Sequence, residues 1–263
     1  MESKQYDRRR GVLLGLAAGD RNGGPIRMAL QLARSLLAVR GFNEVHILKN
    51  YVNWWKADGF DTGPVAGRVF ELVAGGVDPG AAASAVHDEM GGMTGGCNPA
   101  HRSAPLAMAA FIPEKKLAGC AVSEARLTHA GPIAACVSAA TVVLCRKLIM
   151  GTDWEAALAA AGRDRSVETR HALLDAPGRT PTAGGYAPEA LEAAIYFLDR
   201  SGSFGEALGA ALDFAGPANY CPVLVGSIGG ARWGAAAIPP AALAHCGITA
   251  EIDAAASAFN AGK

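Results

Sequence analysis

Two carboxylates lie beside glycines where apolar segments begin or end, and each could act on a bound molecule. Asp61 lies in the loop 59–63 before an apolar helical stripe, and Asp20 follows Gly19 at the end of the first apolar segment. A carboxylate can activate water, or it can stabilise the positive charge that develops as a glycosidic bond breaks. Aspartates in such places also cap helices or accept hydrogen bonds from loop amides, so the structural alternatives stay open.

A second group of reactive side chains occupies the segment 97–102. Cys97 precedes His101 by four residues, a weak indication of a thiol nucleophile paired with a base. His101 could instead act as a general acid or base, or contact a substrate directly. Arg102 could bind a phosphate group or form a structural ion pair.

Helical periodicity predicts the elements that must position these side chains. Apolar residues recur three and four apart in 28–37, 45–55 and 65–73, which is typical of amphipathic helices facing a core. The run 134–148 is almost wholly apolar and predicts a buried central helix. Asp153 and Ser203 are candidate N-caps, and Pro188 suits the first turn of another helix. Since no strand-like alternation persists, we expect one compact all-α domain over residues 1–263, with roughly ten or more helices.

Composition and charge narrow the classes of function. Basic and acidic residues number 24 each, so no excess of positive charge favours binding to nucleic acid. The six cysteines show no CxxC or zinc-ligand spacing, which indicates a reducing cytoplasm. Residues 8–18 superficially resemble a secretory signal, but their two glycines and the following Asp20 favour a mature first helix. No apolar stretch is long and charge-free enough to predict a membrane span.

Several segments follow the order and spacing of a known enzyme family. They are 11–20 (Gly-Val-Leu-Leu-Gly-Leu-Ala-Ala-Gly-Asp), 61–63 (Asp-Thr-Gly), 102–107, 127–130 (Leu-Thr-His-Ala), 185–194, 203–207, 226–234 and 238–239. Together they resemble the ADP-ribosylglycohydrolases, which include dinitrogenase-reductase-activating glycohydrolases. The resemblance implies a compact, single-domain, multi-helix fold. It also implies hydrolysis of N- or O-glycosidic bonds of ADP-ribose, typically with two magnesium ions.

The chain departs from this family where the family binds its metals. A Thr-Asp-Asp-Thr motif should directly precede Met28, but residues 23–26 read Gly-Gly-Pro-Ile. An Asp-x-Asp-Thr motif should follow Gly216, but residues 217–220 read Pro-Ala-Asn-Tyr. The loop after Asp20 is also short and lacks the Glu that several relatives use in catalysis. Because magnesium requires oxygen ligands that usually include carboxylates, we expect no metal site of the family's type, no cofactor, and a rebuilt pocket.

The resemblance also indicates which side chains surround the pocket. It matches Asp61 to an aspartate beside the substrate ribose, and it brings the Gly19–Asp20 pair near the active centre. Asn219 and Tyr220 replace metal ligands and, with Asn22, could bind sugar hydroxyls. Loop filling is the structural alternative for them. The predicted catalytic residues are Asp61, Asp20 and His101; the predicted substrate-binding residues are Asn22, Cys97, Asn98, Arg102, His129, Asn219 and Tyr220.

Two functions from different classes fit these residues. The first is a metal-independent hydrolase, or a related lyase, that cleaves an N-glycosidic bond of a ribosyl or nucleotide-derived small molecule in a specialised metabolic pathway. The alternative is an inactive relative that binds ADP-ribose or a nucleotide as a sensor or partner. A protein–protein scaffold is a third option and would show a filled pocket and an exposed apolar patch. The aglycone, any phosphate on the substrate, and formation of a homo-oligomer stay open.

Overall fold

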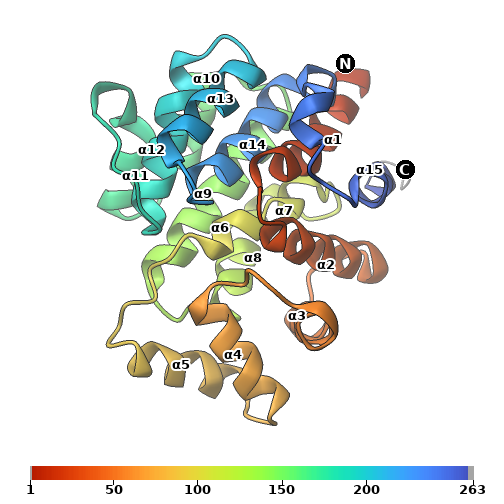
Figure 1. The fold of residues 1–263 in the computed structure, drawn as a ribbon, viewed down its shortest axis with the longest axis vertical. Coiled ribbons are helices and arrows are strands. Elements are labelled where there is room, and N and C mark those ends of the chain that lie inside the picture. The colour runs from red at the N-terminus through yellow and green to blue at the C-terminus, as the bar shows by residue number, and fades with distance from the viewer. Residues whose placement is uncertain (1, 260–263) are drawn as a thin grey trace.

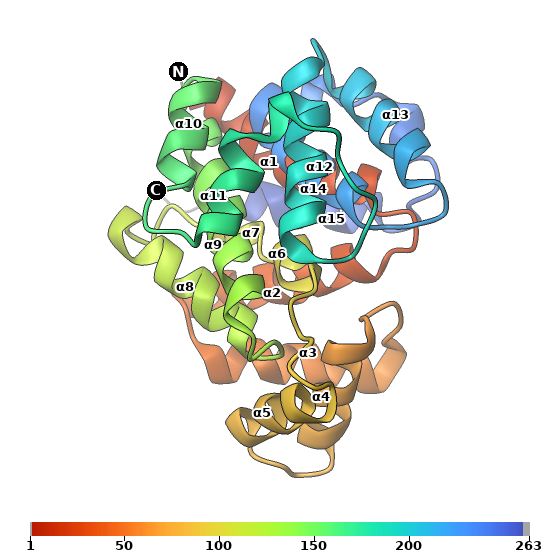
Figure 2. The same cartoon turned by 90° about the vertical axis from the view of Figure 1, so that its left-hand side faces the viewer.

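The chain forms helices joined by short loops, and the computed structural model describes residues 2–259 (Figures 1 and 2). The α-helices are α1 (Glu2–Gly19), α2 (Gly24–Val39), α3 (Glu44–Asp58), α4 (Pro64–Ala74), α5 (Pro79–Glu89), α6 (Asn98–Arg102), α7 (Pro105–Met108), α8 (Glu114–Arg126), α9 (Pro132–Ile149), α10 (Trp154–Ala161), α11 (Val167–Leu174), α12 (Ala187–Arg200), α13 (Phe204–Ala215), α14 (Cys221–Trp233) and α15 (Thr249–Ala258). The 3₁₀ helices are η1 (Ala176–Gly178), η2 (Ala235–Ala237) and η3 (Pro240–Leu243). Within residues 2–259 no strand forms, and one isolated bridge pairs Gly96 with Tyr186. The all-α prediction is therefore confirmed.

Helices α1 and α14 cross in direct backbone contact near the centre of the fold (Figure 1). Gly11 and Gly15 of α1 face Gly230 and Gly226 of α14. A Cβ atom added at any of these four positions would overlap a backbone atom of the facing helix, so only glycine permits this approach. Residues 11–19 are buried here, as expected for a first helix that belongs to the core.

The predicted helix boundaries agree closely with the structure. Asp153 and Ser203 accept hydrogen bonds from backbone N–H groups in the first turns of α10 and α13, so both N-caps are confirmed. Helix α9 is the predicted central helix. By length and composition it could cross a bilayer, but 72% of its apolar window is buried within the fold, which accounts for its composition.

One predicted core position is wrong. Val45 shares the apolar stripe of α3 with Leu48 and Val52, yet its side chain is 79% exposed. The buried face of α3 instead passes through Ile47 and Tyr51. Val45 lies in the first turn of the helix, beyond the surface that the rest of the fold covers.

Helices α3, α4 and α5 form one end of the molecule (Figures 1 and 2). Helices α4 and α5 share a small apolar cluster that is separate from the main core: Val65, Val69, Ala82, Ala83 and Val86. The loops on either side of this helix pair, 59–63 and 91–97, both lead to the cavity described below. Gly63, Gly91 and Gly92 have positive φ angles, which lets these loops turn sharply without strain.

Candidate functional site

Loops that are distant in sequence enclose a cavity of about 520 Å³. They follow α1, α3 and α5, join α8 to α9 and α13 to α14, and precede α12; helix α6 contributes Asn98 and His101. The volume is within the range of small-molecule sites, roughly 300–1,000 Å³. Among the predicted site residues, those that line the cavity are Asn22, Asp61, Asn98, His101, His129, Asn219 and Tyr220. An open cavity is the opposite of the filled pocket expected for a scaffold.

Asp61 is the carboxylate that lines the cavity. Its φ is +49°, an unusual conformation for a residue with a Cβ atom, and its side chain is exposed at the cavity surface. Partial burial raises the pKa of Asp61, against hydrogen bonds from Asn22 and from the Gly24 backbone that lower it. The Nδ2 atom of Asn22 lies 3.3 Å from Oδ1 of Asp61. Gly63, not Asp61, is the N-cap of α4, so the capping alternative does not apply to Asp61. A strained, accessible carboxylate with a raised pKa is a candidate general base.

Two histidines form a buried part of the same cavity. His101 and His129 are 3% and 0% exposed, and the Nε2 atom of each has no hydrogen-bond partner within the described residues. Burial lowers the pKa of His101 to about 4, and the nearby Tyr220 backbone partly opposes this shift. Burial and the charge of Arg102 lower the pKa of His129 to about 3. Both rings are therefore neutral at neutral pH.

The polar side chains that line the cavity differ in their exposure to solvent. Among the polar side chains that line it, Asn22, Asp61 and Tyr220 are exposed and are here called the exposed lining, whereas His101 and His129 are buried and are called the buried lining. Buried polar atoms without a partner are rare in proteins because each costs free energy. Two of them on one cavity indicate a place where a bound molecule completes the hydrogen bonding.

Asp20 is 2% exposed and its carboxylate is fully engaged. Oδ1 accepts hydrogen bonds from the Gly23 N–H and from Nδ2 of Asn219, and Oδ2 accepts one from the Ile26 N–H, each at 2.8 Å. The Oδ1 atom of Asn219 in turn accepts from the Arg21 N–H at 3.2 Å. Asp20 and Asn219 thus connect the loop before α2 to the loop before α14. These bonds to loop N–H groups are the structural alternative that the sequence analysis gave for Asp20. Asp20 is not among the residues that line the cavity.

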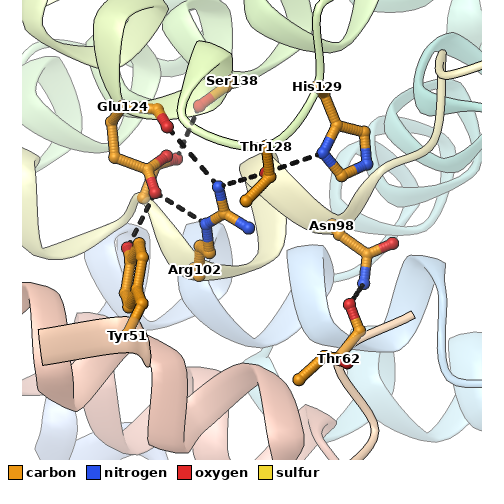
Figure 3. A network of polar contacts seen from close by, with 9 residues as sticks. Tyr51, Thr62, Asn98, Arg102, Glu124, Thr128, His129 and Ser138 are labelled. Carbon is orange, nitrogen blue, oxygen red and sulfur yellow. Dashed lines mark hydrogen bonds and ion pairs between the residues drawn. The ribbon is translucent and has the colours of Figure 1, made fainter. Parts of the chain in front are cut away.

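Arg102 lies behind the cavity, where no phosphate group reaches it. It is 0% exposed, and its Nε atom lies 2.6 Å from Oε1 of Glu124 (Figure 3). The Tyr51 hydroxyl donates to the same carboxylate oxygen at 2.7 Å, and the guanidinium carbon lies 5.0 Å from the Tyr51 ring centre. The structural ion pair, rather than the predicted substrate contact, describes this residue.

Cys97 also lies outside the cavity lining. Its side chain is 1% exposed within the main apolar core, and burial raises the pKa of its thiol to about 12. A thiol that stays protonated is a poor nucleophile, so the predicted pairing with His101 is not supported. The backbone N–H of Cys97 donates to the Gly185 carbonyl and thereby helps to shape the loop that borders the cavity.

Asn98 and Tyr220 line the cavity as predicted, but both also make contacts within the protein that stabilise the loops around it. The Nδ2 atom of Asn98 donates to the Thr62 carbonyl at 3.0 Å, which ties α6 to the loop that carries Asp61. The ring of Tyr220 lies against Gly185, where a Cβ atom would come within 3.1 Å of the ring and require it to shift. That these lining residues bind substrate stays a prediction.

Sequence reasoning missed the partners of Arg102. Glu124 and Tyr51 are both 0% exposed, yet they lie 22 and 51 positions away from it on helices with ordinary amphipathic patterns. A Glu on the buried face of α8 is the signal that could have revealed them, because a buried carboxylate requires a cation. Gly96 also borders the cavity without a side chain, and its role is visible only in three dimensions.

The donor atoms at this cavity do not fit a pair of magnesium ions. Magnesium prefers near-octahedral oxygen ligation with one or two carboxylates for each site. The cavity presents one carboxylate, Asp61, along with amides and a phenol, and the carboxylate of Asp20 already accepts three N–H groups. Among residues 2–259 no cluster of three His, Cys, Asp or Glu side chains is arranged to hold a metal.

Comparison with known proteins identifies the family of this chain. The sequence profile of the ADP-ribosylglycohydrolases matches residues 25–263. A solved structure described as an ADP-ribosylglycohydrolase-related protein complex is similar over 98% of both chains, with a TM-score of 0.81 and 28% sequence identity. No curated protein matches the sequence. The chain therefore belongs to the ADP-ribosylglycohydrolase family, a membership that suggests glycohydrolase activity on ADP-ribosyl compounds.

Proposed function

We propose that this protein is a hydrolase that cleaves the N-glycosidic bond of a ribosyl or nucleotide-derived small molecule without the family's pair of magnesium ions. The observation that carries the proposal is the position of Asp61. It is an accessible carboxylate with a raised pKa on the same cavity as two neutral histidines with free Nε2 atoms. Such convergent polar groups with perturbed pKa values mark candidate active sites.

Asp61 acts in this proposal on the water that attacks the sugar. The bond from the anomeric carbon to the aglycone nitrogen breaks, and its electron pair leaves with the aglycone. The carboxylate stabilises the resulting oxocarbenium-like carbon and accepts a proton from the attacking water, whose oxygen bonds to that carbon. The aglycone takes up a proton from solvent. Asn22 orients the Asp61 carboxylate through its 3.3 Å contact with Oδ1.

The other lining residues position the substrate in this proposal. Asn98, Asn219 and Tyr220 offer amide and phenol groups for sugar hydroxyls, and His101 and His129 offer ring nitrogens at the buried side. We further propose that the protein acts in the cytoplasm on a small ribosyl or nucleotide-like molecule and engages neither nucleic acid nor membrane.

The proposal is tested with a panel of N-ribosides, nucleotides and ADP-ribose conjugates, with magnesium or with a chelator. Release of free base or sugar is measured for the wild type and for Asp61→Asn. Asp58→Asn is the matched control, because Asp58 is an exposed aspartate close in sequence that does not line the cavity. Turnover that survives the chelator and is lost only in Asp61→Asn supports a metal-independent glycosidase. Turnover that requires magnesium contradicts it.

A binding protein without turnover is the second candidate. The full engagement of Asp20 favours it, because among residues 2–259 this leaves Asp61 as the one carboxylate that lines the cavity, whereas many glycosidases use two. Thermal stabilisation by ADP-ribose or a nucleotide, with no product formed from any member of the panel, would select this candidate.

A further inference from the structure

The buried network behind the cavity ends at His129, one of whose ring nitrogens is free. Nδ1 of His129 lies 2.8 Å from the hydroxyl oxygen of Thr128 (Figure 3). Nε2 is buried and has no partner, and His129 is one of the residues that line the cavity. A neutral imidazole carries a single proton, on one nitrogen or the other. The partner of Nδ1 therefore decides whether His129 offers the cavity a donor or an acceptor.

Thr128 is constrained from its other side by Arg102. Nη2 of Arg102 lies 2.8 Å from the Thr128 hydroxyl oxygen, and a guanidinium can only donate. The hydroxyl oxygen therefore accepts from Arg102, and its single hydrogen is free to point to Nδ1 of His129. In the opposite arrangement, with Nδ1–H donating to the hydroxyl, the hydroxyl hydrogen would have no partner in a side chain that is 0% exposed.

The position of Arg102 is itself fixed by buried partners. Glu124 and Tyr51 contact its guanidinium, and all of these side chains are 0% exposed. Neither the guanidinium nor the Thr128 hydroxyl can turn toward solvent to exchange partners. The direction of the hydrogen bond between Thr128 and His129 is therefore set by a rigid charge that lies outside the cavity.

We propose that Arg102 and Thr128 are positioning residues that hold His129 as the Nε2–H tautomer, so that the cavity presents a fixed hydrogen-bond donor at its buried side. This donor selects ligands with an acceptor there: a carbonyl oxygen, a hydroxyl or phosphate oxygen, or an unprotonated ring nitrogen. It disfavours a guanidinium or ammonium group, which would place donor against donor beside the Arg102 charge. The inference deepens the proposed function and rests on it for the location of the ligand.

The tautomer is measured by ¹⁵N–¹H correlation spectra of the full-length protein with ¹⁵N-labelled histidine, without any ligand. We expect the proton of His129 on Nε2 in the wild type and in Thr128→Ser, which keeps the hydroxyl. We expect loss of that preference in Thr128→Val, which has a similar shape but no hydroxyl. A proton on Nδ1 in the wild type, or an unchanged tautomer in folded Thr128→Val, overturns the proposal.

The ligand class is tested on the same signal with named probes. Inosine and ADP-ribose should shift the His129 Nε2–H signal, whereas agmatine, which carries a guanidinium and no such acceptor, should not. Hypoxanthine and ribose, added separately, show whether the acceptor belongs to the base or to the sugar. An equal response to agmatine, or no response to either inosine or ADP-ribose, overturns the selection of acceptors.

These measurements separate the inference from the proposed function. The Asp61→Asn protein binds probes without turning them over if Asp61 is the base, so its spectra can be recorded with substrate present. If Asp61→Asn retains full turnover, the proposed function fails while the tautomer result stands. If the tautomer result fails, Asp61 keeps its role and His129 loses its fixed donor.

Discussion

The exposed and buried linings of the cavity differ in the free-energy cost of a polar group that has no hydrogen-bond partner. Asn22, Asp61 and Tyr220 reach solvent, so an unused hydrogen-bonding group among them costs little. His101 and His129 do not reach solvent, and each keeps an unpartnered Nε2 atom in a place where an apolar side chain would be more stable. The exposed lining therefore costs little stability with or without a ligand, whereas the buried lining costs stability unless a ligand pairs with it.

The largest expected effect concerns the exposed lining and is on rate. Asp61→Asn removes the candidate base and should lower kcat by about 10²–10⁴-fold, the usual contribution of general acid–base catalysis, with little change in ligand affinity. Steady-state kinetics on the substrate found in the panel measures this, with Asp58→Asn as control. A fall in affinity with kcat unchanged would make Asp61 a binding residue only.

Replacing Arg102, which lies behind the buried lining, should cause the largest loss of stability. Arg102→Met leaves the Glu124 carboxylate buried without its cation and should cost about 3–5 kcal/mol of unfolding free energy. Urea denaturation measures the loss, and adding Glu124→Leu should recover part of it, because the unpaired charge is then gone. The exposed pair of Arg68 and Glu89 is the control, and Glu89→Gln should produce a much smaller change.

The buried histidines should make stability depend on acidity. Their folded-state pKa values of about 4 and about 3 are below the value of about 6.5 in the unfolded chain. As pH falls from about 6.5 towards 4, these histidines become protonated in the unfolded state but stay neutral in the folded state. The free energy of unfolding therefore falls by about 3 kcal/mol for each histidine. Above about pH 7 this contribution is complete and constant.

Replacing these histidines tests that pH dependence directly. His101→Gln and His129→Gln, singly and together, should flatten the curve of unfolding free energy against pH between about 4 and 6.5. His171→Gln is the control, because His171 is an exposed histidine that does not line the cavity. An acid-induced loss of stability that stays the same in the double variant would assign it to other groups.

Asn219 offers a smaller test at the link between two loops. In Asn219→Asp, a carboxylate replaces the amide that donates to Asp20 at 2.8 Å, so two acceptors face each other. We expect a loss of about 1–3 kcal/mol at neutral pH, measured by thermal unfolding. Asn219→Ala removes the bond without adding charge and is the control. Recovery of stability on adding magnesium to Asn219→Asp alone would show that one substitution moves these loops back towards metal binding.

The smallest expected effect is steric and concerns only the buried lining. A Cβ atom at Gly96 would lie 3.8 Å from both Oδ1 of Asn98 and Nε2 of His129, which is ordinary contact distance. Gly96→Ala should therefore leave the melting temperature and the His129 tautomer unchanged while weakening binding of inosine or ADP-ribose several-fold. Unchanged affinity would mean that the ligand does not approach His129 from this side.

Particular residues show how far the sequence could be interpreted. The apolar run of α9 and the caps Asp153 and Ser203 depend on local patterns, and the structure confirms them. The family motifs also brought Asp61 and Asn219 into view, and both line the cavity. Arg102 and Cys97 have reactive side chains in a loop-like segment, but that segment forms the short helix α6, which buries them.

The sequence by itself determined the all-α class, the main amphipathic helices, the family and the loss of the metal motifs, because these depend on residue types at short range and in fixed order. Only the tertiary structure decided which polar groups face a ligand. Glu124 reaches Arg102 from another helix, and this pairing turns a candidate phosphate-binding residue into a buried support for His129. Burial and the choice of hydrogen-bond and ion-pair partners depend on contacts between distant segments, so no local sequence pattern predicts them.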